Sequence, residues 1–248
     1  MPWLPENISL LGGKVDFLFY VVLAITGAVF VLVEVTLLAF LVLYRRREGR
    51  AAAYTHGNHT VEVIWTLVPA AILVVLAILS QRTLSEMHSP AAYAGEPLEV
   101  EVTAEQFAWN VKYAQSGVTA LNRMRIPVNR PIRVALGSKD VIHSFFLPNL
   151  RLKQDTLPGM KTSVMFEAIK TGTYDIACAE FCGLAHYRMR GYLTVLEPAE
   201  FDAWLAGEIQ AMQPPAPPSA PLEPPPAAAP PAEAPAPSAP SAPVPAPA

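Results

Sequence analysis

The clearest pattern along the chain is a pair of long apolar blocks near its start. The first block covers residues 17–44 and contains one acidic residue, Glu34, and the second covers residues 61–80. A helix needs roughly 20 apolar residues to cross the hydrocarbon core of a bilayer, because each residue adds about 1.5 Å. The pattern therefore predicts a hairpin of two membrane-spanning helices within an N-terminal segment, residues 1–81.

The segment between the two blocks is rich in arginine. Arg45, Arg46, Arg47 and Arg50 are accompanied by one acidic residue, Glu48. Short arginine-rich loops remain on the cytoplasmic side of a membrane. We therefore expect an integral protein of a bacterial inner or plasma membrane, with both termini on the periplasmic or outer side.

Beyond residue 82 the apolar runs become short and rich in β-branched and aromatic residues, and glycine and proline separate them. This pattern is typical of an all-β antiparallel sandwich or barrel. The expected strands are residues 98–103, 107–113, 132–136, 141–147, 160–166, 173–177 and 191–196. Pro198 then begins an amphipathic helix that should reach Met212, since proline is tolerated in a first helical turn. Residues 82–212 are thus expected to form one domain outside the membrane.

Composition sets the last part of the chain apart and excludes one class of function. Of the 26 prolines, 16 lie in residues 213–248, where alanine supplies most of the rest. Such a segment has too few branched or aromatic side chains to build a core, so we expect it to be disordered. The chain is 52% hydrophobic and 16% charged, with a formal net charge of -3. These values indicate a membrane protein and offer no basic surface for nucleic acid.

The densest group of reactive side chains lies within 12 residues and comprises Cys178, Cys182, His186 and Met189. His143, in an apolar expected strand of the same domain, could supply a second imidazole. A thioether is a poor ligand for zinc or magnesium and a good ligand for copper. Taken together, the five residues favour a copper site.

The two cysteines are open to other interpretations. A cysteine pair outside the cytoplasm could form a disulfide, and a Cys2His2 zinc site could use the same residues without Met189. A blue-copper site needs only one thiolate, with two imidazoles and a weak axial methionine. Two thiolates could instead bridge two copper ions, each ending in one histidine. Such a centre suits electron transfer, because its geometry changes little on reduction.

Several motifs together resemble subunit II of the haem–copper cytochrome c oxidases. They are Cys-x-Glu-x-Cys-Gly-x-x-His-x-x-Met at residues 178–189, Val-Ile-His-Ser-Phe at 141–145, Lys-Gln-Asp at 153–155 with Pro-Gly at 158–159, and Glu-Val-Ile-Trp-Thr-Leu-Val-Pro at 62–69. The resemblance extends over about residues 17–196. It implies that the hairpin is followed by a cupredoxin-like Greek-key sandwich or barrel.

The resemblance also implies a binuclear copper centre of the type called CuA. Its ligand positions match His143 and His186 as terminal imidazoles, Cys178 and Cys182 as bridging thiolates, and Met189 as the axial thioether. Glu180 matches the residue that ligates copper through its backbone carbonyl. The side chain of Glu180 matches the ligand of a magnesium ion at the interface with the catalytic subunit, and a carboxylate suits that hard ion.

Glu62 lies near the cytoplasmic end of the second apolar block. It matches the family glutamate at the mouth of a proton-uptake channel. An acid near the end of a membrane span is costly and is a functional candidate for that reason. An interfacial ion pair with the arginines of residues 45–50 is the simpler alternative.

Electron uptake is where this sequence departs from the family pattern. Relatives usually carry Gln-Trp-x-Trp, in which the first tryptophan lies under the docked cytochrome c, whereas residues 106–109 are Gln-Phe-Ala-Trp. Phe107 takes the uptake position, and Trp109 points to the same side of the expected strand. Both could instead be core aromatics. Residues 82–212 contain 13 basic and 14 acidic side chains. The domain therefore has no marked excess of negative charge that would attract a strongly basic donor protein.

The resemblance implies that the chain accepts electrons from cytochrome c or another haem donor. It would pass them to the haem groups of catalytic subunit I, which reduces O2 to water coupled to proton pumping. Subunit III and other oxidase subunits are further implied partners, and no O2-reducing site is expected in this chain. The alternatives are a copper-free structural subunit II of a quinol oxidase and the CuA domain of a nitrous-oxide-reductase-like enzyme. The complete ligand set argues against the first, and the hairpin argues against the second.

Overall fold

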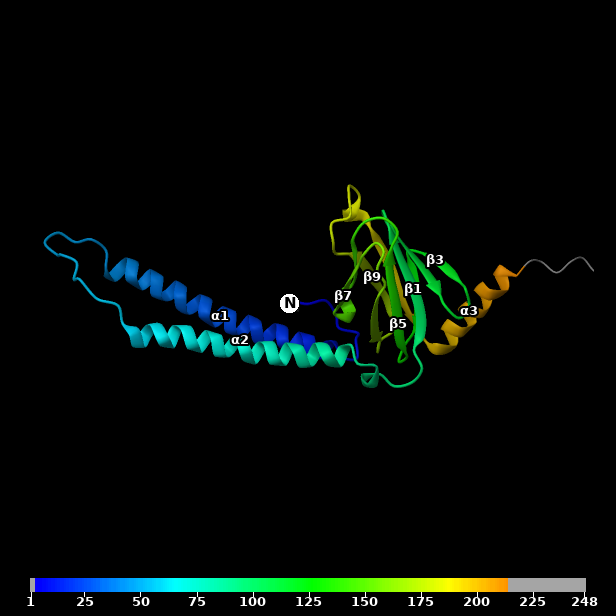
Figure 1. Cartoon of the computed structure of the whole chain (residues 1–248), viewed down its shortest axis with the longest axis horizontal. Coiled ribbons are helices and arrows are strands. Elements are labelled where there is room, and N and C mark those ends of the chain that lie inside the picture. Colours follow the sequence, from blue (N-terminus) through cyan, green and yellow to red (C-terminus); the bar gives the residue numbers. More distant parts are fainter. Residues whose placement is uncertain (1–2, 214–248) are drawn as a thin grey trace, which may run out of the picture. The chain divides into compact units, whose positions relative to one another are not determined.

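The structure is a computed structural model that describes residues 3–213 (Figure 1). Two long helices come first, α1 (Gly12–Leu43) and α2 (His59–Met87), and a third helix, α3 (Pro198–Met212), follows ten strands. The extent of α3 confirms the helix predicted after the last strand. The segment predicted to be disordered, residues 213–248, lies outside the described residues except for its first residue.

Helices α1 and α2 are both long and apolar enough to cross a membrane, and both are longer than the apolar blocks that predicted them. Helix α2 begins at His59 because the Asn58 side chain caps it, accepting hydrogen bonds from the N–H groups of Thr60 at 3.1 Å and Val61 at 3.3 Å. A cap of this kind stabilises a helix by about 1 kcal/mol. The helix continues to Met87 because most of residues 81–87, which have the sequence Gln-Arg-Thr-Leu-Ser-Glu-Met, are good helix formers. The boundary predicted between residues 81 and 82 therefore falls inside α2.

Ten strands form two five-stranded sheets. The first sheet has the order β3-β2-β1-β5-β8 and contains β1 (Leu98–Glu105), β2 (Ala108–Tyr113), β3 (Thr119–Leu121), β5 (Pro131–Ser138) and β8 (Thr162–Glu167). The second has the order β4-β10-β9-β6-β7 and contains β4 (Arg123–Pro127), β6 (His143–Leu147), β7 (Leu152–Thr156), β9 (Gly172–Cys178) and β10 (Arg190–Leu196). The two sheets confirm the expected cupredoxin-like sandwich.

The pairing of strands differs in one respect from the antiparallel arrangement that the sequence predicted. Strand β1 runs parallel to β5, and β10 runs parallel to β4. Parallel neighbours need a crossover connection, and the chain provides one by passing from β3 in the first sheet to β4 in the second before it returns as β5. Each sheet is therefore mixed.

Three strands, β3, β4 and β7, were not predicted. Strand β3 has only three residues, and β4 and β7, with the sequences Arg-Met-Arg-Ile-Pro and Leu-Lys-Gln-Asp-Thr, carry charged residues that obscure their alternation. Conversely, Val141 and Ile142 were expected in a strand but are 37% and 44% exposed and precede β6. Pairing with a neighbouring strand determines whether each of these segments forms a strand, because strand propensity depends strongly on context.

The core lies between the two sheets. Its largest fully buried side chains include Trp109 from β2 and Phe145 from β6, whose ring centroids are 5.4 Å apart. Helix α3 adds Phe201, which packs near Tyr113. Burial of a large apolar side chain contributes about 1.5–3 kcal/mol to the free energy of unfolding. This core therefore gives firm support to the loop that joins β9 to β10.

Candidate metal centre

The soft donor side chains predicted from the sequence come together at one end of the second sheet. His143 is the first residue of β6 and Cys178 is the last residue of β9. These strands are antiparallel neighbours in which Phe145 lies opposite Cys178, so His143 and Cys178 are at the same end of the sheet. The loop that joins β9 to β10 carries the remaining donors, Cys182, His186 and Met189.

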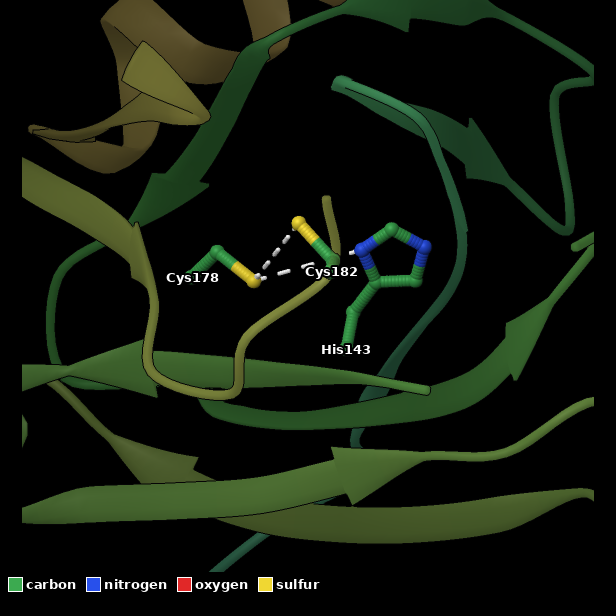
Figure 2. A group of neighbouring side chains, drawn as sticks. All are labelled: His143, Cys178 and Cys182. Carbon is green, nitrogen blue, oxygen red and sulfur yellow. Dashed lines mark hydrogen bonds between the residues drawn. The ribbon is translucent and has the colours of Figure 1, made fainter. Parts of the chain in front are cut away.

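The two cysteines face each other as free thiols. Their sulfur atoms are 3.8 Å apart, well beyond the roughly 2 Å of a disulfide bond. Figure 2 shows the His143 ring turned towards this pair, with its Nδ1 atom 3.9 Å from the Cys178 sulfur. The ligand atoms of the three residues all lie within 4.8 Å of one another, a spacing that suits a shared metal centre.

The second half of the group is arranged in a similar way around Cys182. The Nδ1 atom of His186 lies 3.5 Å from the Cys182 sulfur, and the Met189 sulfur lies 3.6 Å from it. On the other side, the Glu180 carbonyl oxygen accepts a hydrogen bond from the Cys178 thiol at 3.2 Å. Each cysteine therefore has one imidazole beside it, with a thioether near one sulfur and a carbonyl near the other.

This donor set fits copper better than it fits other metals. Thiolate, thioether and imidazole are ligands that copper prefers, and a zinc site would leave the methionine unused. Met189 and Cys182 are each 3% exposed and His143 is fully buried, so the protein largely excludes water from this side. The burial of a thioether directly against a thiol is the feature that the zinc interpretation does not explain.

Asp140 fixes the orientation of His143. Its Oδ1 atom lies 2.8 Å from Nε2 of the ring, which leaves Nδ1 facing Cys178. Burial alone would raise the pKa of the Asp140 carboxyl, but hydrogen bonds from His143 and from the backbone N–H groups of Gln106 and Val141 hold that pKa at about 2. The carboxylate therefore stays ionised, and such a partner typically sets the tautomer of a metal-binding imidazole.

The Cys182 thiol is unlike a free surface thiol. Burial, followed by the adjacent Cys178 thiol, raises the pKa of Cys182 to about 12. Such a group is protonated at neutral pH and becomes a thiolate only when a nearby cation compensates its charge. Metal binding at this pair should therefore release protons.

The structure separates the two candidate electron-uptake residues. Phe107 is partly buried and packs against the core from the turn between β1 and β2. Trp109 is fully buried, with its ring edge-on to His143 at a centroid distance of 6.2 Å, and its Nε1 atom has no hydrogen-bond partner among residues 3–213. Trp109 is thus a core residue that a docked protein cannot touch directly.

The two glutamates singled out in the sequence occupy different places. Glu180 lies in the loop of the metal centre, with its carbonyl towards Cys178 and its residue exposed. Glu62 lies in the first turn of α2 and is not part of this group. In the part of the chain that the structure describes, the ion pair of Glu62 is with His59, at 3.9 Å, and the alternative of a pair with an arginine of residues 45–50 finds no support there.

Sequence reasoning missed two residues that contact the candidate ligands. Asp140 carries a local signal, because it precedes His143 by three residues and ends up beside its ring. Gln106 carries none of this kind: its side chain donates a hydrogen bond to the Cys182 carbonyl at 2.6 Å across 76 residues of sequence. Only the packing of the first sheet against the second brings Gln106 to the loop that joins β9 to β10.

Comparison with known proteins gives a consistent result. Residues 100–195 match the family described as cytochrome c oxidase subunit II, periplasmic domain, and residues 4–83 match its transmembrane domain. Cytochrome c oxidase subunit 2 of Thermostichus vulcanus is 32% identical over 81% of this chain and 77% of its own length. Quinol oxidase subunit 2 of Bacillus subtilis (strain 168) is 30% identical over 82% of this chain and 63% of its own length.

Among solved structures, the chain is similar to the periplasmic domain of subunit II of the cytochrome oxidase of Bradyrhizobium japonicum. The two are 29% identical, and the match covers 48% of this chain and 99% of that chain with a TM-score of 0.46.

The two family matches follow the order of the structure. The transmembrane match covers α1 and most of α2, and the periplasmic match covers the strands and the loop that hold the soft donors. The chain is thus a membrane protein with a periplasmic domain, and at family level a subunit of a haem–copper terminal oxidase. It belongs to the cytochrome c oxidase subunit II family.

Proposed function

We propose that this chain is the electron-accepting subunit of a cytochrome c oxidase and holds a binuclear CuA centre. The imidazoles of His143 and His186, the thiolates of Cys178 and Cys182, the thioether of Met189 and the carbonyl of Glu180 would be its ligands. The observation that carries the proposal is the pair of free thiols 3.8 Å apart, each with an imidazole beside it. When bound, such a centre supplies a one-electron acceptor whose charge is shared between two copper ions.

The chain's own residues are suited to hold such a centre with little rearrangement. His143 is fixed by Asp140 and by its position at the start of β6, where its carbonyl accepts a hydrogen bond from the Thr156 hydroxyl at 3.2 Å. Met189 is tied to the other cysteine, because its carbonyl accepts the N–H of Cys178 at 3.2 Å. His143 and Cys178 lie on paired strands, and a site built on strands is held more precisely than one built on loops alone.

A copper titration of the full-length chain in detergent tests the proposal. Two copper ions per chain are expected, because two thiolates and two terminal imidazoles provide for two metal ions. The similarity to a quinol oxidase subunit makes a copper-free structural role the main competing function. A chain that binds no copper would support that role, and a chain that binds only one copper ion would also contradict the proposal.

We also propose that the exposed side chain of Glu180 contributes to a magnesium site at the interface with the catalytic subunit. Its carbonyl faces Cys178 while the residue remains exposed, so one residue could serve both metals. A carboxylate oxygen is the kind of ligand that magnesium prefers.

The arginine-rich loop supports a definite orientation. We propose that it lies on the cytoplasmic side and that both termini lie on the periplasmic or outer side, with α1 and α2 as the anchor and the strands with α3 as the copper domain. The domain would then face a cytochrome c or another haem donor, and the hairpin would contact haem-containing subunit I, subunit III and other oxidase subunits. Electrons would pass from the donor to the haem groups of subunit I for the reduction of O2, coupled to proton pumping.

Glu62 is proposed to lie at the entrance of a proton channel of the partner subunit. Glu62→Ala should slow steady-state turnover of the assembled oxidase, because proton uptake would lose its carboxylate, while electron transfer from cytochrome c to copper keeps its normal rate. Turnover and stopped-flow copper reduction measure the two steps separately.

The matched control for Glu62 is Glu48→Ala, which removes an exposed acid from the loop between α1 and α2. The control should turn over normally. Equal turnover in both variants would mean that Glu62 has no part in proton uptake and serves only as the ion-pair partner of His59.

A further inference from the structure

Gln106 contacts the loop that carries Cys182 directly and is connected to His143 through Asp140. Its side-chain amide donates a hydrogen bond to the Cys182 carbonyl at 2.6 Å, and its backbone N–H donates to Oδ2 of Asp140 at 2.7 Å. The other oxygen of Asp140 lies 2.8 Å from Nε2 of His143. One residue therefore connects the backbone of a thiol ligand with the carboxylate that orients an imidazole ligand.

The residue after Gln106 is Phe107, and both lie against Gly183 of the metal-binding loop. A Cβ atom added to Gly183 would come 2.7 Å from the Gln106 amide nitrogen and 3.3 Å from the Phe107 ring. Gly183 has a φ of +132°, a conformation that glycine adopts far more readily than other residues. Glycine at this position therefore allows the turn between β1 and β2 to approach the loop closely.

Gln106 is itself an exposed residue, and an exposed glutamine ordinarily gains little from giving up its side-chain freedom. Here the side chain is directed at one carbonyl of the loop. We propose that Gln106 is a positioning residue that holds the turn bearing Phe107 against the copper-binding loop. Its amide also withdraws charge from the Cys182 carbonyl. The inference rests on the proposed CuA function, and it assigns Gln106 a part in both the rate of electron uptake and the reduction potential.

Two substitutions at Gln106 and one control test this role in the full-length chain and the assembled oxidase. Gln106→Leu keeps the approximate size and removes the donor, and Gln106→Glu places a carboxylate against the Cys182 carbonyl. The control is Asn110→Leu in β2. The Asn110 amide also bonds a backbone carbonyl, that of Thr103 at 3.4 Å, and the Glu105 carboxylate at 2.8 Å, and neither partner belongs to the metal-binding loop.

Gln106→Leu should retain its copper and show a lower reduction potential, because the carbonyl beside Cys182 would regain electron density. Its rate of donor oxidation should fall about threefold to tenfold, the factor that corresponds to one neutral hydrogen bond. Gln106→Glu should lower the potential further, since it adds a negative charge. Asn110→Leu should leave the potential and the rate unchanged.

An unchanged potential and an unchanged rate in Gln106→Leu would overturn this inference, even if the melting temperature fell. A drop in rate of the same size in Asn110→Leu would also overturn it, because the effect would then belong to the strand pair and not to the loop contact. The copper content of the unsubstituted chain is measured first. A copper-free chain would refute the proposed function together with this inference. A chain with two copper ions, whose Gln106 variants keep the reduction potential and the rate of donor oxidation unchanged, would refute this inference alone.

Discussion

Cys182→Ser should abolish the proposed binuclear copper centre and cause the largest loss of copper affinity among the substitutions proposed for this chain. Both cysteine sulfurs lie near the other thiol and near one imidazole, but only the Cys182 sulfur also lies near the thioether of Met189. Its distances to the Cys178 sulfur, to Nδ1 of His186 and to the Met189 sulfur are 3.8, 3.5 and 3.6 Å. Serine is close to cysteine in size, but its hydroxyl is a hard and weak donor for copper. Loss of a residue that only supports a metal ligand lowers metal affinity by about 10-fold to 100-fold. We expect the loss of a ligand itself to lower copper affinity by more than about 100-fold.

The control for this experiment is Met189→Leu, which keeps the volume of a buried side chain. The thioether is a weak axial ligand in sites of this kind, so copper should stay bound while the reduction potential shifts. Metal analysis and visible absorption of the two purified variants measure the difference. Full retention of two copper ions with an unchanged spectrum in Cys182→Ser would contradict the bridging role that we propose for Cys182.

Phe107→Ala should slow oxidation of the donor cytochrome by about tenfold or more, as truncation of an aromatic anchor commonly does in small interfaces. Phe107 is partly exposed and lies against the loop at Gly183, so it can touch both a docked donor and the metal-binding loop. Copper content and spectrum should stay unchanged. Stopped-flow donor oxidation and copper analysis on the same oxidase preparation measure both.

Phe107→Trp distinguishes an uptake residue from a core residue. A larger ring should be tolerated at a partly exposed position, but it would destabilise a tightly packed one by about 1–3 kcal/mol. Trp109→Ala gives the contrasting case, because truncating a fully buried tryptophan typically costs about 3–5 kcal/mol. A normal donor rate in Phe107→Ala, together with a large loss of thermal stability, would mean that Phe107 is core and that electrons are taken up elsewhere.

Long continuous patterns in the sequence predicted their structures well. The blocks at residues 17–44 and 61–80 predicted α1 and α2 because nothing but a long apolar helix accounts for them. The spacing of Cys178, Cys182, His186 and Met189 predicted that these soft donors lie close together, since all four lie in one strand end and one loop. His143 could be added because it is a histidine in an apolar strand.

Features that depend on distant partners could not be predicted in the same way. Strand β7, with the sequence Leu-Lys-Gln-Asp-Thr, has no clear alternation and is extended because it pairs with β6. Trp109 and Phe107 have the same side-chain class and neighbouring positions, yet one is fully buried and the other is not. The contact of Gln106 with Cys182 depends on how the turn between β1 and β2 meets a loop 76 residues away.

The electron paramagnetic resonance spectrum of the copper-loaded full-length chain, with one unpaired electron per centre, tests the central claim most directly. If Cys178 and Cys182 bridge two copper ions, the electron is shared and the hyperfine splitting should arise from two equivalent copper nuclei. Hyperfine splitting from a single copper nucleus would contradict the binuclear centre.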